Sequence, residues 1–200
     1  VMILTVVISL VTGLAFRKKF FGSNLLFYTT VASLIVPSIL VSLGIGLIFN
    51  IMGWEVSWTT SGLGAHLTWT LPFGFLIMIA VFNRFDKSYE EAARDLGASN
   101  WQTIRHVVLP IIGPSLIGVA LFGFTLSYDE FARTLMTSGV KNTLPLEIFG
   151  MTTNVTTPTL YALGTLTTFF SLFMILTAMG VLFYLRRRQE SHGSDAGKGV

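Results

Sequence analysis

Charged residues are scarce in this chain of 200 residues, because Asp, Glu, Lys and Arg make up 12% of it and hydrophobic residues 52%. A soluble domain usually has about a quarter of its residues charged. Five runs contain no charged residue at all: 1–16, 20–54, 56–83, 106–128 and 148–185. A membrane-spanning helix needs ~20 consecutive apolar residues, and four of these runs are long enough. The pattern excludes a soluble protein and predicts an all-α, polytopic helical membrane protein.

Cysteine is absent, which excludes disulfides, thiolate metal sites and cysteine nucleophiles. The three histidines have no partners at metal-ligand spacing, and we interpret each as interfacial or solvated: His66, His106 and His192. The phosphate-binding pattern Gly-x-x-x-x-Gly-Lys-Ser/Thr is also missing, since the only Gly-Lys pair, Gly197-Lys198, is followed by glycine. We therefore expect no catalytic residue, no metal, no cofactor and no ATP hydrolysis by this chain.

The apolar runs predict about five transmembrane helices, at roughly 1–16, 26–49, 64–82, 107–127 and 160–185. The polar segments between them alternate between the two sides of the membrane. Eleven of the thirteen Lys and Arg residues lie on one side, in the segments 17–25, 83–106 and 186–200. Because basic residues favour the cytoplasm, that side, including the C-terminus, is predicted to be cytoplasmic. This topology accounts for the net charge of +3 without a nucleic-acid partner.

The first run is short for a span and has no basic region ahead of it. We expect one more helix upstream, which would give six in the full-length protein. A single transmembrane domain is predicted over 1–188. The tail 189–200 is polar and rich in Gly and Ser, so it is expected to be a disordered cytoplasmic tail.

Two prolines lie inside predicted spans, Pro37 in the second and Pro72 in the third. Proline removes a backbone hydrogen bond and kinks a helix. In a membrane, such breaks persist where neighbouring helices or a cavity accommodate them. The sequence leaves open whether these positions line a pathway or gate, or are packing kinks.

The cytoplasmic loop 83–110 is too long for a simple turn and contains signals for two short helices. Ser88 and Glu91 form a capping-box pattern, and Ser99 and Gln102 form a second. Gly97, between them, is placed where a left-handed helix end is expected. The bulky side chains of the loop, Tyr89, Leu96 and Trp101, suit docking into a groove of a partner. The alternative is a solvated amphipathic helix on the membrane surface.

This loop resembles the EAA motif of the permeases of ATP-binding cassette (ABC) importers. The matching positions are Glu91, Ala92, Ala93, Gly97, Leu109 and Pro110, with Val107 where the family usually has isoleucine. The resemblance implies the fold of such a permease, in which this loop is a coupling helix that inserts into an ATPase subunit. It implies a polar contact from Glu91 and a sharp turn at Gly97. The implied partners are ABC ATPase subunits, a second permease subunit that we expect to be a paralogue, an extracytoplasmic solute-binding protein and membrane lipid.

Two acidic residues, Asp129 and Glu130, follow the fourth run at its extracytoplasmic end. Adjacent carboxylates at a membrane mouth attract cations. The surrounding segments Ser127–Phe131 and Leu144–Ile148 look like the spermidine/putrescine branch of these permeases, so a polyamine pathway is expected here. The alternative is an ordinary helix end at which Asp129 pairs with Arg133.

Two other classes of protein compete with an importer subunit. A secondary transporter or channel needs ionisable relays inside its spans, and the runs contain only His66 and His106. An intramembrane enzyme needs a cluster of catalytic side chains within the spans, which is not visible. Among importer permeases, substrates such as iron, sulfate, phosphonates or opines stay open. We expect a location in the bacterial plasma (inner) membrane.

Overall fold

The computed structural model describes the backbone of residues 1–154 and 158–195, and this part of the chain is helical apart from its connections, which confirms the predicted all-α class. The elements in chain order are α1 (Met2–Phe16), α2 (Ser23–Ser33), α3 (Ser38–Ile51), α4 (Ser61–Arg84), α5 (Ser88–Asp95), α6 (Asn100–Thr103), the π-helical turn η1 (Ile104–Val108), α7 (Leu109–Tyr128), α8 (Leu144–Asn154) and α9 (Pro158–Asp195).

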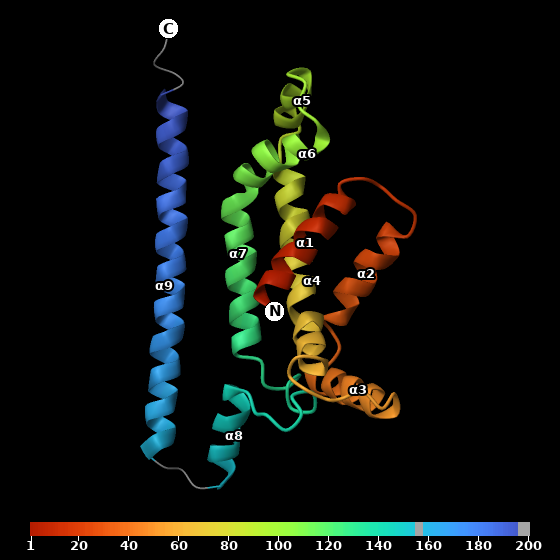
Figure 1. Cartoon of the computed structure of the whole chain (residues 1–200), viewed down its shortest axis with the longest axis vertical. Coiled ribbons are helices and arrows are strands. Elements are labelled where there is room, and N and C mark those ends of the chain that lie inside the picture. The colour runs from red at the N-terminus through yellow and green to blue at the C-terminus, as the bar shows by residue number, and fades with distance from the viewer. Residues whose placement is uncertain (155–157, 196–200) are drawn as a thin grey trace.

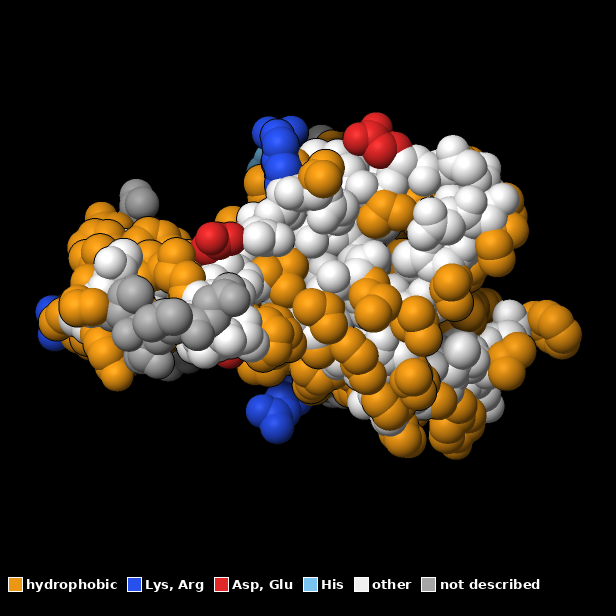
Figure 2. Space-filling model, turned by 90° about the horizontal axis from the view of Figure 1, so that it is seen from below, with side chains coloured by type: hydrophobic (Ala, Val, Ile, Leu, Met, Phe, Trp, Pro, Cys, Tyr) orange, Lys and Arg blue, Asp and Glu red, His pale blue; other side chains and the backbone are white. Residues whose placement is uncertain are grey.

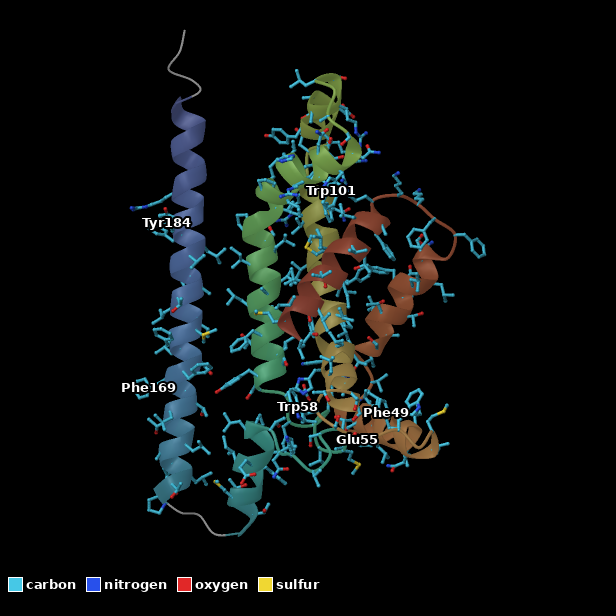
Figure 3. All side chains as sticks on the ribbon, in the orientation of Figure 1. Phe49, Glu55, Trp58, Trp101, Phe169 and Tyr184 are labelled. Carbon is cyan, nitrogen blue, oxygen red and sulfur yellow. The ribbon has the colours of Figure 1, made fainter. Side chains whose placement is uncertain are left out.

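Three helices, α1, α4 and α7, pack against one another and form the centre of the molecule (Figure 1). Their contact surface is a small apolar core made of Met78, Phe82, Val108, Ile112 and Val119. The last helix, α9, lies alongside α7, and none of its apolar window is buried in this chain. Its outer side chains, including Phe169 and Tyr184, point away from the bundle (Figure 3).

Helix α1 approaches α4 closely because its buried face consists of small residues at every fourth position: Thr5, Ser9 and Gly13. The hydroxyls of Thr5 and Thr70 are 2.8 Å apart. A methyl group at Gly74 would collide with Ser9, and one at Gly13 would lie 2.8 Å from the Cβ of Met78. Small residues let helix backbones approach in membranes, where packing rather than hydrophobic burial drives association. The stripe therefore fixes α1 against α4.

Three helices are long and apolar enough to cross a membrane, over Ser61–Arg84, Asn100–Tyr128 and Pro158–Tyr184. They contain the predicted spans 64–82 and 107–127 and all but the last residue of the predicted span 160–185. The predicted span 1–16 corresponds to α1, which has 15 residues and is shorter than the ~20 needed to cross a bilayer. Among the described residues, the count of helices able to span by length and composition is therefore three, or four if the bent pair α2–α3 is one span.

The predicted span 26–49 is broken within its length, because α2 and α3 meet at an angle of 108°. The break is at Pro37, which has the extended backbone angles φ −56° and ψ 129°. Proline also disfavours helical geometry at the preceding residue, so α2 ends at Ser33. Pro72, by contrast, lies within the continuous helix α4.

The connections gather at the two ends of the bundle (Figure 1). Helices α5 and α6 lie at one end, on the side towards which α9 runs. Helices α3 and α8 and the segment 129–143 lie at the other end, where Ser42 accepts a hydrogen bond of 3.0 Å from the backbone N–H of Met136. Seen from this second end, the surface is a mixture of hydrophobic and uncharged groups, and charged side chains are few (Figure 2).

The structure extends α9 beyond the predicted domain end. The backbone from Gln189 to Asp195 continues the helix, where the sequence predicts a disordered tail. The last five residues, 196–200, lie outside the described part of the chain.

Candidate coupling loop and substrate pathway

The loop between α4 and α7 has the predicted form of two short helices joined at a glycine. Helix α5 ends at Asp95, and Gly97 has a φ of 84°, which is the left-handed region that glycine adopts without a steric penalty. Helix α6 begins three residues later, at Asn100. The predicted left-handed turn at Gly97 is confirmed, and it sets the orientation of α6 relative to α5.

The two predicted capping boxes have different outcomes. Ser99 and Gln102 form a complete one, with hydrogen bonds of 2.8 and 3.3 Å between each side chain and the other residue's backbone N–H. The prediction of a capping box at Ser88 was wrong, because Ser88 is already inside α5. Its backbone N–H donates a hydrogen bond of 2.9 Å to the carboxylate of Asp86. That bond lowers the pKa of Asp86 below the ordinary value of 3.8.

The second half of the loop runs directly into the span α7. A π-helical turn, Ile104–Val108, joins α6 to α7, so the helix is continuous from Asn100 to Tyr128. Pro110 is exposed at the second position of α7, directly after this π-helical turn. Leu109 packs against the core of α1, α4 and α7. The end of the motif is thus a rigid junction between the loop and the bundle.

The tip of the loop presents apolar and acidic side chains to its surroundings. Glu91 and Ala92 are exposed, Ala93 is half-buried, and Glu91 has no side-chain partner among the described residues. Leu96 is 89% exposed and Trp101 65%, and Trp101 lies on α6 at this end of the molecule (Figure 3). Exposed large apolar and aromatic side chains are typical of a protein-binding surface.

Glu90, the residue before the motif, was missed by the sequence analysis. It is the buried residue of α5, with 7% of its surface exposed. Its carboxylate lies 2.5 Å from the guanidinium of Arg17 at the end of α1, and 3.8 Å from Arg94 one turn away. Arg17 is 73 positions away in the sequence, so no local pattern indicates the pair.

The two acidic residues predicted to line the pathway point in different directions. Asp129 is exposed and lines a cavity of about 610 Å³ between α7, α8 and α9. Glu130 is buried, and its carboxylate accepts a hydrogen bond of 2.8 Å from the backbone N–H of Arg133. Of these two residues, the structure therefore brings Asp129, and not Glu130, to the cavity.

The alternative pair of Asp129 with Arg133 is not among the ion pairs of the described residues. The side chain of Arg133 is fully buried instead. It donates a hydrogen bond of 2.6 Å to the hydroxyl of Thr68 and lies 4.8 Å from the ring centre of Trp69. These contacts attach the segment 129–143 to α4. The contact between Arg133 and Trp69 adds a cation–π interaction.

The interpretation of His66 as interfacial or solvated was wrong. It is buried, and both ring nitrogens have partners at 2.9 Å: Nδ1 faces the hydroxyl of Ser127, and Nε2 that of Thr134. The imidazole therefore joins α4, the end of α7 and the segment 129–143. His66 also lines a second cavity of about 540 Å³, together with Trp58 and Tyr128. Its packing could not be read from spacing, because its partners are more than 60 positions away.

The other two histidines do not form a site with His66. His106 is exposed and lies within hydrogen-bond distance, 3.1 Å, of the backbone carbonyl of Gln102. The side chain of His192 lies outside the described residues. Over the described residues, no group of three or more His, Cys, Asp or Glu side chains is arranged to hold a metal ion.

Related proteins place this architecture among transport proteins. The chain is 33% identical over 178 residues to the spermidine/putrescine transport system permease protein PotC of Haemophilus influenzae, covering 88% of this chain and 65% of the relative. It is 30% identical over 182 residues to the putrescine transport system permease protein PotI of Escherichia coli K12, covering 86% and 62%. The chain therefore spans somewhat less than two thirds of the length of these relatives.

A solved structure has the same fold. A chain of the MetNI methionine ABC transporter, in a crystal form with inward-facing conformations, superposes with a TM-score of 0.61 at 18% identity, over 92% of this chain and 86% of that one. The family model of the binding-protein-dependent transport system inner membrane component matches residues 5–191. With nearly its whole length matched and its motif loop folded as the sequence predicts, the chain belongs to this family of membrane transport components.

Proposed function

We propose that this chain is the transmembrane permease subunit of an ABC importer, which forms the pathway for a small solute while a separate subunit hydrolyses ATP. The observation that carries the proposal is the form of loop 83–110. Its two short helices turn at Gly97 and expose Leu96, Trp101 and Glu91. A compact helical projection with apolar side chains fits a groove in a partner.

In this proposal, loop 83–110 and the C-terminal end of α9 face the cytoplasm of a bacterium, and the chain lies in its plasma membrane. The Lys and Arg residues concentrated at this end of the bundle support the orientation. The proposed partners are ABC ATPase subunits at the loop, a second permease subunit, which we expect to be a paralogue, and an extracytoplasmic solute-binding protein at the opposite end.

Coupling is tested by purifying the complex through a tag on the permease. Glu91→Lys is expected to lower the recovery of the ATPase subunit by about tenfold, since an ionic contact turned repulsive costs about 1–2 kcal/mol. Lys141→Glu is the control, because it is a charge reversal of the same magnitude and opposite sign at an exposed site on the opposite end. Equal ATPase recovery from both variants would contradict the proposal.

We further propose that the solute is a cation of the polyamine class. PotC and PotI are named for spermidine and putrescine transport, and the cavity beside α7 offers a carboxylate with aromatic rings. Asp129 lines it together with Tyr128, Phe131 and Phe149. A carboxylate attracts an ammonium group, and aromatic faces bind cations once water is excluded.

The substrate is tested by uptake of labelled putrescine in cells that lack other polyamine importers. Asp129→Asn is expected to reduce uptake at least about fivefold, which corresponds to the loss of about 1 kcal/mol of cation binding. Glu55→Gln is the control, since Glu55 is an exposed acid at the same end and away from this cavity. Unchanged putrescine uptake in the Asp129 variant would exclude Asp129 from the pathway, and uptake of sulfate in place of putrescine would exclude a polyamine solute.

A further inference from the structure

Glu90 is an unusual residue for the surface loop in which it lies. Helix α5 is otherwise exposed or half-buried, whereas Glu90 is 7% exposed. A carboxylate is rarely buried without a partner, because the loss of hydration is costly. Its partner is Arg17, whose guanidinium nitrogen lies 2.5 Å from the carboxylate oxygen. At this distance and degree of burial, the contact is a charge-assisted hydrogen bond.

Arg17 is itself held in place by the bundle. It follows the last residue of α1, and its guanidinium carbon lies 5.2 Å from the ring centre of Phe82 and 5.4 Å from that of Phe85. Phe82 belongs to the apolar core, and Phe85 follows the end of α4. The guanidinium is thus sandwiched between the end of α4 and the carboxylate on α5, with only 16% of its side chain exposed.

The pair gives α5 a connection to the bundle beyond its covalent ones. The chain joins α5 to α4 through residues 85–87 and to α7 through α6 and η1, whereas the ionic contact joins Glu90 to α1. Helix α1 is in turn fixed to α4 by its stripe of small residues and by the contact between Thr5 and Thr70. A displacement of α5 therefore moves the C-terminal end of α1 through the ion pair, and α1 moves with it as one helix.

We infer that Glu90 is a positioning residue, which passes the movement of the coupling loop to α1 through Arg17. The inference rests on the proposed function, in which an ATPase subunit moves this loop. Glu91 and Glu90 then have separate tasks, since Glu91 faces outward to the ATPase and Glu90 faces inward to the bundle. An ATPase that binds normally to the loop therefore drives transport only while the ion pair between Glu90 and Arg17 is present.

The test uses the complete importer, with both permease subunits, the ATPase and the binding protein, reconstituted in lipid vesicles. Three quantities are measured: ATPase recovery with the permease, ATP hydrolysis, and uptake of labelled putrescine. Glu90→Gln is expected to keep ATPase recovery and ATP hydrolysis within about twofold of the original protein. Putrescine uptake per ATP is expected to fall about tenfold, in the usual range of coupling between sites.

The charge exchange Arg17→Glu with Glu90→Arg restores the pair in reverse. Arg94 lies 3.8 Å from the carboxylate of Glu90, so an arginine at position 90 would repel it. Because its side chain is about half exposed, Arg94 can turn to solvent in this variant. Uptake per ATP is expected to recover to within about threefold of the original protein, whereas Arg17→Glu alone stays uncoupled. If Glu90→Gln does not assemble, the comparison of this exchange with Glu90→Asp, which keeps the charge and shortens the reach, gives the same information.

Three results would overturn the inference: an unchanged ratio of uptake to ATP in Glu90→Gln, a parallel loss of ATP hydrolysis and uptake, or no recovery in the charge exchange. Failure of the proposed function is distinguishable from these results. It would appear in the original protein, as no recovery of ATPase with the permease or no putrescine uptake.

Discussion

The imidazole Nε2 of His66 lies 2.9 Å from the hydroxyl of Thr134, and this contact fastens α4 to the segment that follows α7. The single proton of the Thr134 hydroxyl is donated to the backbone carbonyl of Glu130, 2.7 Å away. Thr134 therefore accepts from His66, which assigns the ring proton to Nε2 and leaves Nδ1 to accept from Ser127. The end of α7 and the cavities beside it are held by this chain of hydrogen bonds.

Thr134→Val is expected to lower the free energy of unfolding by about 1–3 kcal/mol, because it leaves the N–H of a buried imidazole without an acceptor. Thr125→Val is the control, since its exposed hydroxyl bonds only to the carbonyl of Leu121 in its own helix. The change is measured by thermal unfolding in detergent. Equal melting temperatures for the two variants would show that the His66 contact contributes nothing.

Gly97→Ala is expected to weaken the coupling loop, because a side chain at a φ of 84° costs about 1 kcal/mol. We expect ATPase recovery with the permease to fall severalfold, while Gly97→Asn has a smaller effect because asparagine tolerates this conformation better. Gly53→Ala is the matched control. Gly53 has a φ of 66° and open space around it, but it lies at the opposite end of the molecule. A loss of ATPase in this control as well would attribute the effect to general strain.

Gly74→Ala is expected to separate α1 from α4, because the added methyl group collides with Ser9 on the buried face of α1. Overpacking of this kind costs about 1–3 kcal/mol. Gly64→Ala on the same helix is the control, since nothing lies within 4 Å of the added methyl group. The measurement is the melting temperature of each variant. If Gly74→Ala is as stable as Gly64→Ala, the small-residue stripe is not the basis of this packing.

The start of α5 is expected to depend on pH through Asp86. The backbone N–H of Ser88 lowers the pKa of this carboxyl, so its stabilising effect is present above the ordinary value of 3.8 and is lost as pH falls through the lowered pKa. Hydrogen exchange at the Ser88 amide is therefore expected to accelerate below that range, beyond the intrinsic effect of pH. Asp86→Asn is expected to flatten this dependence, and an identical profile in both proteins would rule out the bond.

The orientation of the chain can be tested directly, because the absence of cysteine allows single cysteines to be introduced on the natural background. Lys141→Cys is expected to react with a membrane-impermeant maleimide in cells stripped of their outer membrane. Asn100→Cys, exposed at the other end, is expected to react only after the membrane is opened. The reverse pattern would place loop 83–110 outside the cell.

Local signals predicted the form of loop 83–110 well. The left-handed glycine, the Ser99 capping box and the helix after it depend on residues within four positions of one another, and short-range hydrogen bonds decide them. The prediction failed at Ser88 because Asp86, two residues earlier, competes for the same N–H. Pro37 indicated a break in the second span, but its size, 108°, depends on what α2 and α3 pack against.

The sequence by itself determined that this is a helical membrane protein with one elaborate loop, because the length of apolar runs and the chemistry of turns are local properties. Only the tertiary structure decided which polar side chains are buried and with what partner. Glu90 rather than Glu91 faces the bundle, Asp129 rather than Glu130 reaches a cavity, and His66 is satisfied on both sides. Whether a given side chain is buried or exposed depends in these cases on a partner more than 60 positions away in the sequence, or on the local orientation of the turn after α7. Spacing along the chain does not encode these relationships.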